Sequence, residues 1–150
     1  MSALKHGGLL LATASLATLA ACATTHGALT SSANRMAHDA DVLALNTRAD
    51  SAEYGTRDYS RDGRSVAAQA DALRRSVQDR PVDARNVTDA LDRLARSYDT
   101  LREDANRSGN PNALAELNPV TRDYLGIESE AELSLALQQY AQSRNGSGRS

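Results

Sequence analysis

The sequence predicts an all-α protein, an up-and-down antiparallel bundle of four helices that follows a flexible N-terminal tether. Three observations support this fold class. Apolar residues recur at intervals of three and four along most of the chain, no useful length of sequence alternates with a period of two, and the connections between periodic segments are short. A three-helix array that dimerises is the alternative, because each predicted helix offers only one narrow apolar seam.

The first 21 residues have the pattern of a secretion signal. Lys5, the only lysine of the chain, lies in a short positive start, and residues 9–21 then carry no charge. A helix over these 13 residues rises only about 20 Å, too little for a hydrocarbon core about 30 Å thick. The apolar segment is therefore typical of a secretory leader and not of a transmembrane helix.

This leader ends in Leu19-Ala20-Ala21-Cys22, which resembles the lipobox of bacterial lipoproteins. The resemblance covers about 22 residues. It implies that the Cys22 thiol receives a diacylglyceryl group, that a signal peptidase cuts between Ala21 and Cys22, and that the new amino terminus also carries an acyl chain such as palmitate. The alternative is a soluble protein whose apolar first helix includes a buried cysteine.

The residue after the cysteine is Ala23 and not aspartate. In a Gram-negative host, the resemblance then implies the outer membrane, with the protein facing the periplasm. Cys22 is the only cysteine, so lipidation excludes both a disulfide and a cysteine nucleophile. We expect four parts: a signal peptide (1–21), a flexible lipidated tether (22–31), the bundle domain (32–143) and a disordered tail (144–150).

The first two helices of the bundle are predicted from their apolar faces. Pro81 is expected to end the second helix. The first face comprises Ala33, Met36, Ala37, Ala40, Leu43, Ala44 and Thr47, and the second comprises Tyr59, Gly63, Val66, Ala70, Leu73 and Val77.

The third helix has Asp83 as its expected N-cap, and Arg107-Ser108-Gly109-Asn110-Pro111-Asn112 is a stop and turn signal at its end. The fourth segment is less regular, because Asn118-Pro119 and Gly126 predict a short turn before a final helix. The third helix has the seam Ala84, Val87, Leu91, Leu94, Tyr98, Leu101 and Ala105, and the final helix has the face Ala131, Leu135, Ala136 and Tyr140.

Composition excludes several activities. The formal charge is −2, and acidic and basic residues are mixed along the chain, so no basic face for nucleic acid is expected. Carboxylates occur near arginines three or four residues away, as in Asp89–Arg93, Asp92–Arg96 and Asp99–Arg102, which is typical of weak intrahelical ion pairs. No Gly-x-Ser-x-Gly or Ser-x-x-Lys motif is present. We therefore expect no enzyme.

A metal or haem site could use only Met36, His38 and His26. Met36 and His38 do not share a helix face, and the Cys-x-x-Cys-His haem motif is absent. We therefore expect no cofactor and no metal, with Met36 in the core and His38 in solvent.

The expected function is that of a lipid-anchored envelope protein that acts by binding, either to another envelope protein or to itself. A small-ligand, metal or haem carrier and a periplasmic enzyme are the alternatives. The expected partner surface comprises Val120, Tyr124, Leu125 and Ile127 around the predicted break, and Tyr54 and Tyr59 around Gly55. Packing of these residues at the ends of the bundle is the other interpretation.

Overall fold

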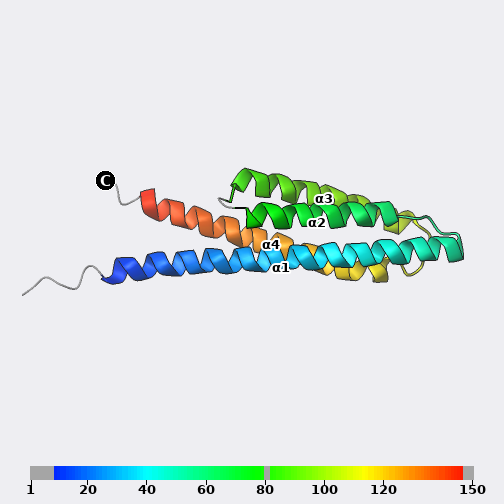
Figure 1. Ribbon diagram of the computed structural model, residues 1–150, viewed down its shortest axis with the longest axis horizontal. Coiled ribbons are helices and arrows are strands. Elements are labelled where there is room, and N and C mark those ends of the chain that lie inside the picture. Colours follow the sequence, from blue (N-terminus) through cyan, green and yellow to red (C-terminus); the bar gives the residue numbers. More distant parts are fainter. Residues whose placement is uncertain (1–8, 80–81, 147–150) are drawn as a thin grey trace, which may run out of the picture.

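The computed structural model describes residues 9–79 and 82–146, with side chains at residues 25–79, 82–136 and 139. These residues form four helices and no strand: α1 (Leu9–Tyr54), α2 (Ser60–Gln78), α3 (Ala84–Arg107) and α4 (Ala113–Gly146). The predicted all-α, four-helix bundle is confirmed. Successive helices run in opposite directions, and α1 and α4 extend beyond the end of α2 and α3 (Figure 1). α1 packs against both α2 and α4, whereas α3 and α4 contact one another least.

Most residues of the predicted apolar faces form the core, but the prediction is wrong for Ala84 of the third helix and for Leu135 and Ala136 of the final helix, which are exposed. Leu43 of α1, Leu73 of α2 and Leu94 of α3 are almost completely buried. Aligned leucines, valines and alanines from all four helices thus form one continuous cluster. Its other members include Met36, Ala40, Val66, Ala70, Tyr98, Leu101, Leu117, Val120 and Ile127.

Local capping residues determine where several helices begin and end. The Asp83 side chain accepts a hydrogen bond from the Arg85 backbone N–H at 2.9 Å, which confirms the predicted N-cap of α3. Gly55 and Gly109 follow the ends of α1 and α3 with φ angles of 68° and 76°, a conformation that glycine adopts without strain. The predicted stop after residue 107 is therefore confirmed.

Gly63 permits a close approach of α1 and α2. A Cβ atom at this position would lie 3.1 Å from the Ala40 carbonyl oxygen and 3.1 Å from the Ala44 Cβ. The α1 face opposite Gly63 is built of alanine, so the two backbones pack with little side-chain volume between them. Glycine at position 63 is thus a packing requirement of the α1–α2 interface.

The expected flexible tether at residues 22–31 is wrong, because α1 continues without a break through these residues. Thr25 and Leu29 are buried, with Leu29 only 2% exposed. These two positions and Ala33 recur every four residues, so α1 already presents a buried side chain at Thr25, the first side chain described, seven residues before the expected start of the domain at residue 32. Small and polar composition suggested a linker, but threonine and alanine are compatible with a helix that gains burial from its neighbours.

The expected break at Asn118-Pro119 is also wrong, because α4 runs through Pro119 and Gly126. Proline lacks the N–H group for one helical hydrogen bond and crowds the preceding turn. Burial of Leu117, Val120 and Ile127 on one face of α4 compensates for that cost. The helix also extends to Gly146, so residues 144–146 of the expected tail are helical.

Some predictions lie outside the described residues. They are the expected helix end at Pro81, the charged start at residues 1–8 and the tail at residues 147–150. The side chains of Ala21, Cys22 and Tyr140 also lie outside the description, although their backbones belong to α1 and α4.

The close approach of α1 and α2 at Gly63 predicts that a larger residue at this position destabilises the protein. Gly63→Val should lower the free energy of unfolding by about 1–3 kcal/mol, because two of the nearest atoms are backbone atoms of α1 that cannot move independently. Urea unfolding monitored by far-UV circular dichroism measures this change.

Gly27→Val is the matched control, because Gly27 is an exposed helical glycine where an added Cβ atom would meet no other atom within 4 Å. It should change the free energy of unfolding by less than about 0.5 kcal/mol. Equal effects of the two substitutions would contradict the proposed role of Gly63.

Candidate functional site

Three of the residues expected to form a partner surface are part of the core. Tyr59, Val120 and Ile127 are almost completely buried, so the expected surface is wrong for them. Tyr59 directly precedes α2, and Val120 and Ile127 lie on the inward face of α4, where the apolar periodicity that indicated them also buries them. These residues stabilise the bundle and are not accessible to another protein.

Tyr124 is half-buried and stacks on Tyr98 of α3, with ring centroids 4.2 Å apart and an interplanar angle of 14°. The Tyr98 hydroxyl donates a hydrogen bond to the Thr121 hydroxyl at 2.9 Å. Burial, and then the nearby Glu128 carboxylate, raise the pKa of Tyr124 well above its ordinary value. This aromatic pair joins α3 to α4, the two helices with the thinnest contact.

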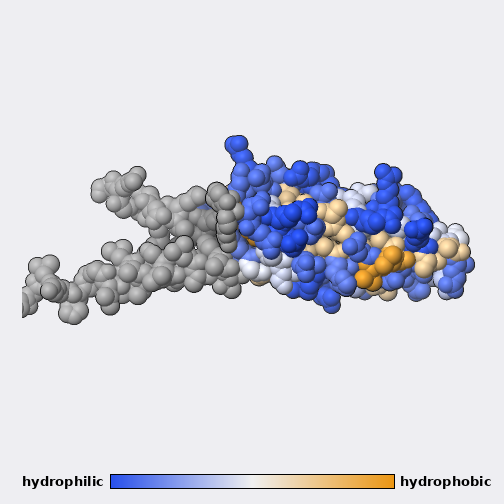
Figure 2. Space-filling model, viewed as in Figure 1, coloured by the Kyte–Doolittle hydropathy of each residue, from blue (hydrophilic) through white to orange (hydrophobic). Residues whose placement is uncertain are grey.

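Exposed apolar side chains lie on the outward faces of α1 and α4. Val42 and Leu45 of α1 are 41% and 69% exposed, and Tyr54 and Leu125 from the expected partner surface are also exposed. Figure 2 shows an orange patch on the part of α1 that carries Val42 and Leu45, surrounded by hydrophilic residues. We call Val42 and Leu45 the α1 patch. Leu114, Leu133 and Leu135 are the further exposed leucines of α4.

A polar cluster crosses the interface between α1 and α4. The Arg35 guanidinium donates from Nη2 to the Ser32 hydroxyl at 2.8 Å and from Nε to Asp123 Oδ1 at 3.5 Å. The Ser32 hydroxyl donates to Glu130 Oε1 at 3.0 Å. We call Ser32, Arg35, Asp123 and Glu130 the α1–α4 polar cluster. It links two turns of α1 to two carboxylates that lie seven residues apart on α4.

Asp123 is the most deeply buried carboxylate of this cluster, with 3% of its surface exposed. Its Oδ2 atom is buried and has no hydrogen-bond partner among the described residues. Burial, and then the charge of Asp39, raise the pKa of Asp123, while Arg35 and Arg122 act in the opposite direction. Arg35 itself is more than half exposed, so solvent weakens its attraction for the carboxylate.

Two further pairs of carboxyl groups meet at the other end of the bundle. Burial, and then a hydrogen bond with Asp50, raise the pKa of Glu116, and burial followed by a hydrogen bond with Asp104 raises that of Asp62. Asp50 also accepts a hydrogen bond from the Asn110 amide at 2.9 Å. These groups connect helices across the ends of loops, so they favour a structural role over a catalytic pair in a cleft.

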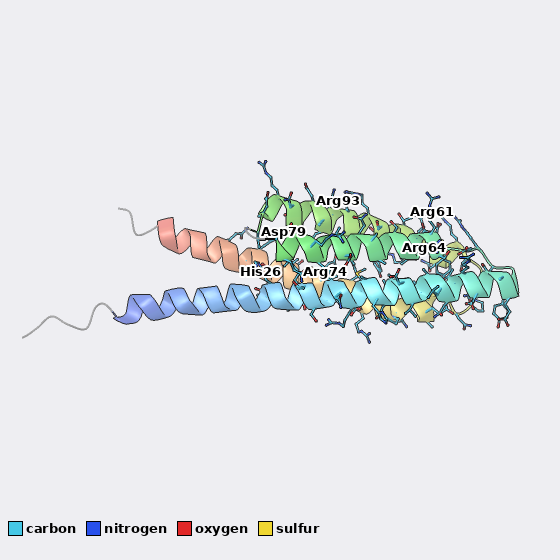
Figure 3. The ribbon with its side chains drawn as sticks, viewed as in Figure 1. His26, Arg61, Arg64, Arg74, Asp79 and Arg93 are labelled. Atoms are coloured by element: carbon cyan, nitrogen blue, oxygen red, sulfur yellow. The ribbon has the colours of Figure 1, made fainter. Side chains whose placement is uncertain are left out.

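An apolar cavity lies at the opposite end of the bundle, where α2 ends and α3 begins. It is small, with about 30 Å³ of free space, room for only one or two water molecules. Figure 3 shows His26 of α1 and Asp79, after the end of α2, at this end. The lining comes from all four helices and the α2–α3 connection: His26, Leu29, Val77, Val82, Ala84, Val87, Thr88, Leu91, Ala131, Ser134 and Leu135.

The candidate metal and haem residues do not converge. Met36 is buried in the core and His38 is exposed, as expected, while His26 lines the apolar cavity. Within the described residues, no three histidine, cysteine or carboxylate side chains form a group that could hold a metal ion. The exposed ion pair between Arg102 and Asp99, at 3.2 Å, agrees with the pairing expected from the sequence.

Two features of the bundle were not predicted from the sequence, the α1–α4 polar cluster and the apolar cavity. Asp123 falls between Val120 and Ile127 on the apolar face of α4, which is a signal for a buried carboxylate once α4 is known to be continuous. The cavity had no such signal, because its lining comes from four separate helices.

No family model, curated protein or solved structure matches this chain. In the part of the chain that the structure describes, no helix is both long enough and apolar enough to cross a membrane. Inferences about function therefore depend on the residues of this chain alone.

The buried carboxylate predicts how stability depends on pH. A folded-state pKa above the unfolded value of about 3.9 means that the folded protein binds the proton more tightly. The free energy of unfolding of the wild type, relative to Asp123→Asn, should therefore rise as the pH falls from the folded-state pKa of Asp123 toward 4. Urea unfolding at a series of pH values between about 4 and 7.5 measures the difference.

Asp89→Asn, at an exposed position of α3, is the control for the same chemical change. A difference between wild type and Asp123→Asn that falls toward pH 4 would contradict the interpretation. It would mean that the ion pair with Arg35 outweighs the cost of burial.

Proposed function

We propose that this chain is the precursor of a lipoprotein, cut before Cys22, and that the mature protein is a non-catalytic binding protein of the cell envelope. In this proposal, lipid on Cys22 anchors it in the outer membrane, and the bundle faces the periplasm. The support comes from the Leu19-Ala20-Ala21-Cys22 motif at the end of an uncharged segment. The binding partner is another envelope protein, with no cofactor and no nucleic acid involved.

The course of α1 determines where the lipid would be attached relative to the bundle. α1 passes through Cys22 and continues to Tyr54, a distance of about 50 Å along the helix axis. A lipid at Cys22 would therefore join one end of a rod, with the α1–α2 and α3–α4 connections at the other end. The attachment would be a helix and not a flexible linker.

The α1 patch is the observation that carries the proposed binding role. Val42 and Leu45 lie about 30 and 35 Å beyond Cys22 along α1, so they project from the rod well away from the anchored end. Covering the exposed leucine and valine with another surface would stabilise a complex by roughly 25 cal/mol per Å² of apolar area removed from water. Their hydrophilic surroundings are typical of the polar rim around a protein interface (Figure 2).

The proposed lipid anchor predicts in which cell fraction a variant without Cys22 is found. Cys22→Ser should remove the lipid and move the protein from the membrane fraction to the soluble fraction, because one thioether carries the diacylglyceryl group. Cell fractionation with mass spectrometry of the intact protein measures both effects. Thr24→Ser, which leaves the lipobox residues intact, is the matched control. A Cys22→Ser protein that stays in the membrane fraction would contradict the lipid anchor.

The binding role predicts a partner that depends on the α1 patch. Chemical crosslinking in intact cells, followed by purification of the lipidated protein, should recover one protein in defined proportion. Leu45→Glu should reduce that recovery at least about tenfold, because it places a charge in an apolar contact. Leu133→Glu is the control, because Leu133 is an exposed leucine of α4 outside the α1 patch, and it should leave recovery unchanged. Equal recovery with both variants would exclude the α1 patch as the interface.

A further inference from the structure

α1 carries a second row of apolar residues on the side that neither α2 nor α4 covers. Val42, Leu45, Ala49 and Ala52 are all exposed, and they follow one another at intervals of three, four and three residues. This spacing is that of a heptad repeat, with Val42 and Ala49 at position a and Leu45 and Ala52 at position d. We call these four residues the outer seam. Through such a seam one helix packs along another in a coiled coil.

The charges beside the outer seam are complementary between two copies of α1. Arg48 directly precedes Ala49 and Glu53 directly follows Ala52, so these two residues occupy positions g and e of the repeat. In a parallel, in-register pair of helices, a residue at g faces the partner's residue at the next e position, five residues later. Arg48 of each copy would therefore face Glu53 of the other, which gives two symmetric ion pairs.

Neither of these charges is paired within its own bundle. No carboxylate lies three or four residues from Arg48 in α1, where an intrahelical pair would form. None of the ion pairs among the described residues involves Arg48 or Glu53. The Glu53 carboxylate raises the pKa of the neighbouring Tyr54, but this neutral phenol does not compensate its charge. Both charges are thus available to a second helix that presents the opposite charge at the matching position.

The proposed lipid anchor determines how two copies would meet. Each copy would extend from the membrane along α1, with Val42 about 30 Å and Ala52 about 45 Å beyond Cys22. The same residue of two copies anchored in one membrane then lies at the same height, so the outer seams meet parallel and in register. An antiparallel pair would carry the two Cys22 residues to opposite ends of the dimer, where one membrane could not hold both upright.

We propose that the outer seams of two copies pack against each other, so that the lipoprotein forms a parallel dimer in its membrane. The inference rests on the proposed function and names the binding partner as a second copy of this chain. The seam spans 11 residues, about one and a half heptads, and its two alanines bury little area. Confinement of both copies to one membrane raises their effective concentration, so we expect the dimer in membranes and not in dilute solution.

The test introduces a thiol into the full-length lipidated protein, in which the lipid occupies the native cysteine. Ala49→Cys places two thiols at the same a position of a parallel dimer, within the distance that a disulfide requires. Ala68→Cys is the matched control, because Ala68 is an exposed alanine of α2. In isolated membranes treated with copper phenanthroline, Ala49→Cys should form at least about ten times more disulfide-linked dimer than Ala68→Cys. Non-reducing electrophoresis measures the dimer.

Charge reversal in the Ala49→Cys protein tests the pairing across the seam. Arg48→Glu places like charges opposite each other in a parallel pair and should reduce the linked dimer at least about threefold. Addition of Glu53→Arg restores opposite charges and should return the dimer to within about twofold of its original amount. Addition of Asp41→Arg instead should not restore it, because Asp41 lies opposite Arg48 only in an antiparallel pair. All these residues are exposed, so far-UV circular dichroism should be unchanged.

Mass spectrometry separates failure of this inference from failure of the proposed function. Protein without lipid mass on Cys22 would overturn both. Lipidated protein in which Ala49→Cys forms no more dimer than Ala68→Cys would overturn the pairing of two copies and leave the anchor in place. Capture of a different protein through the α1 patch, with no dimer, would overturn this inference and leave the binding role in place. Rescue by Asp41→Arg and not by Glu53→Arg would overturn the parallel arrangement.

Discussion

The packing of α1 against two neighbours is the constraint on which the rest of the structure depends. On one side, Gly63 lets α2 approach the backbone of α1 at Ala40 and Ala44. On the other, Ser32 and Arg35 bond to carboxylates of α4. The two interfaces differ in their physical basis, because the first is apolar and tight while the second is partly buried and charged. α3 does not pack directly against α1. It packs against α2, and its Tyr98 stacks on Tyr124 of α4.

Sequence periodicity predicted the helices that pack through regular seams and failed where tertiary packing opposed local signals. The seams of α1, α2 and α3 were predicted because leucine, alanine and valine recur on one face. The break at Pro119 was predicted from proline chemistry alone, and the burial of neighbouring residues outweighed that cost. The tether at residues 22–31 failed for a related reason, because a polar composition does not show that Thr25 and Leu29 will find a core.

Prediction of the candidate site was less successful than prediction of the fold. Apolar periodicity alone did not separate buried positions such as Val120 and Ile127 from an exposed one such as Leu125. All three lie just after Pro119, where a break in the helix was expected, so their positions on a continuous helix could not be assigned. The α1–α4 polar cluster required knowledge of which helices are neighbours. The cavity required the relative positions of four helices, which no single segment encodes. Whether a segment is helical can be predicted from its own residues, whereas a cavity lined by several helices depends on how the helices assemble.

An uninterrupted α1 links the proposed anchor to the core, and the rigid attachment of the bundle to its lipid depends on this continuity. Amide hydrogen exchange of residues 25–33 in the folded protein tests it directly. Exchange should be slowed at least about 100-fold relative to an unstructured peptide, because these amides belong to a packed helix. Exchange at the unstructured rate in residues 25–33, together with protection from Met36 onward, would mean that a flexible tether joins the anchor to the bundle and would contradict a continuous α1.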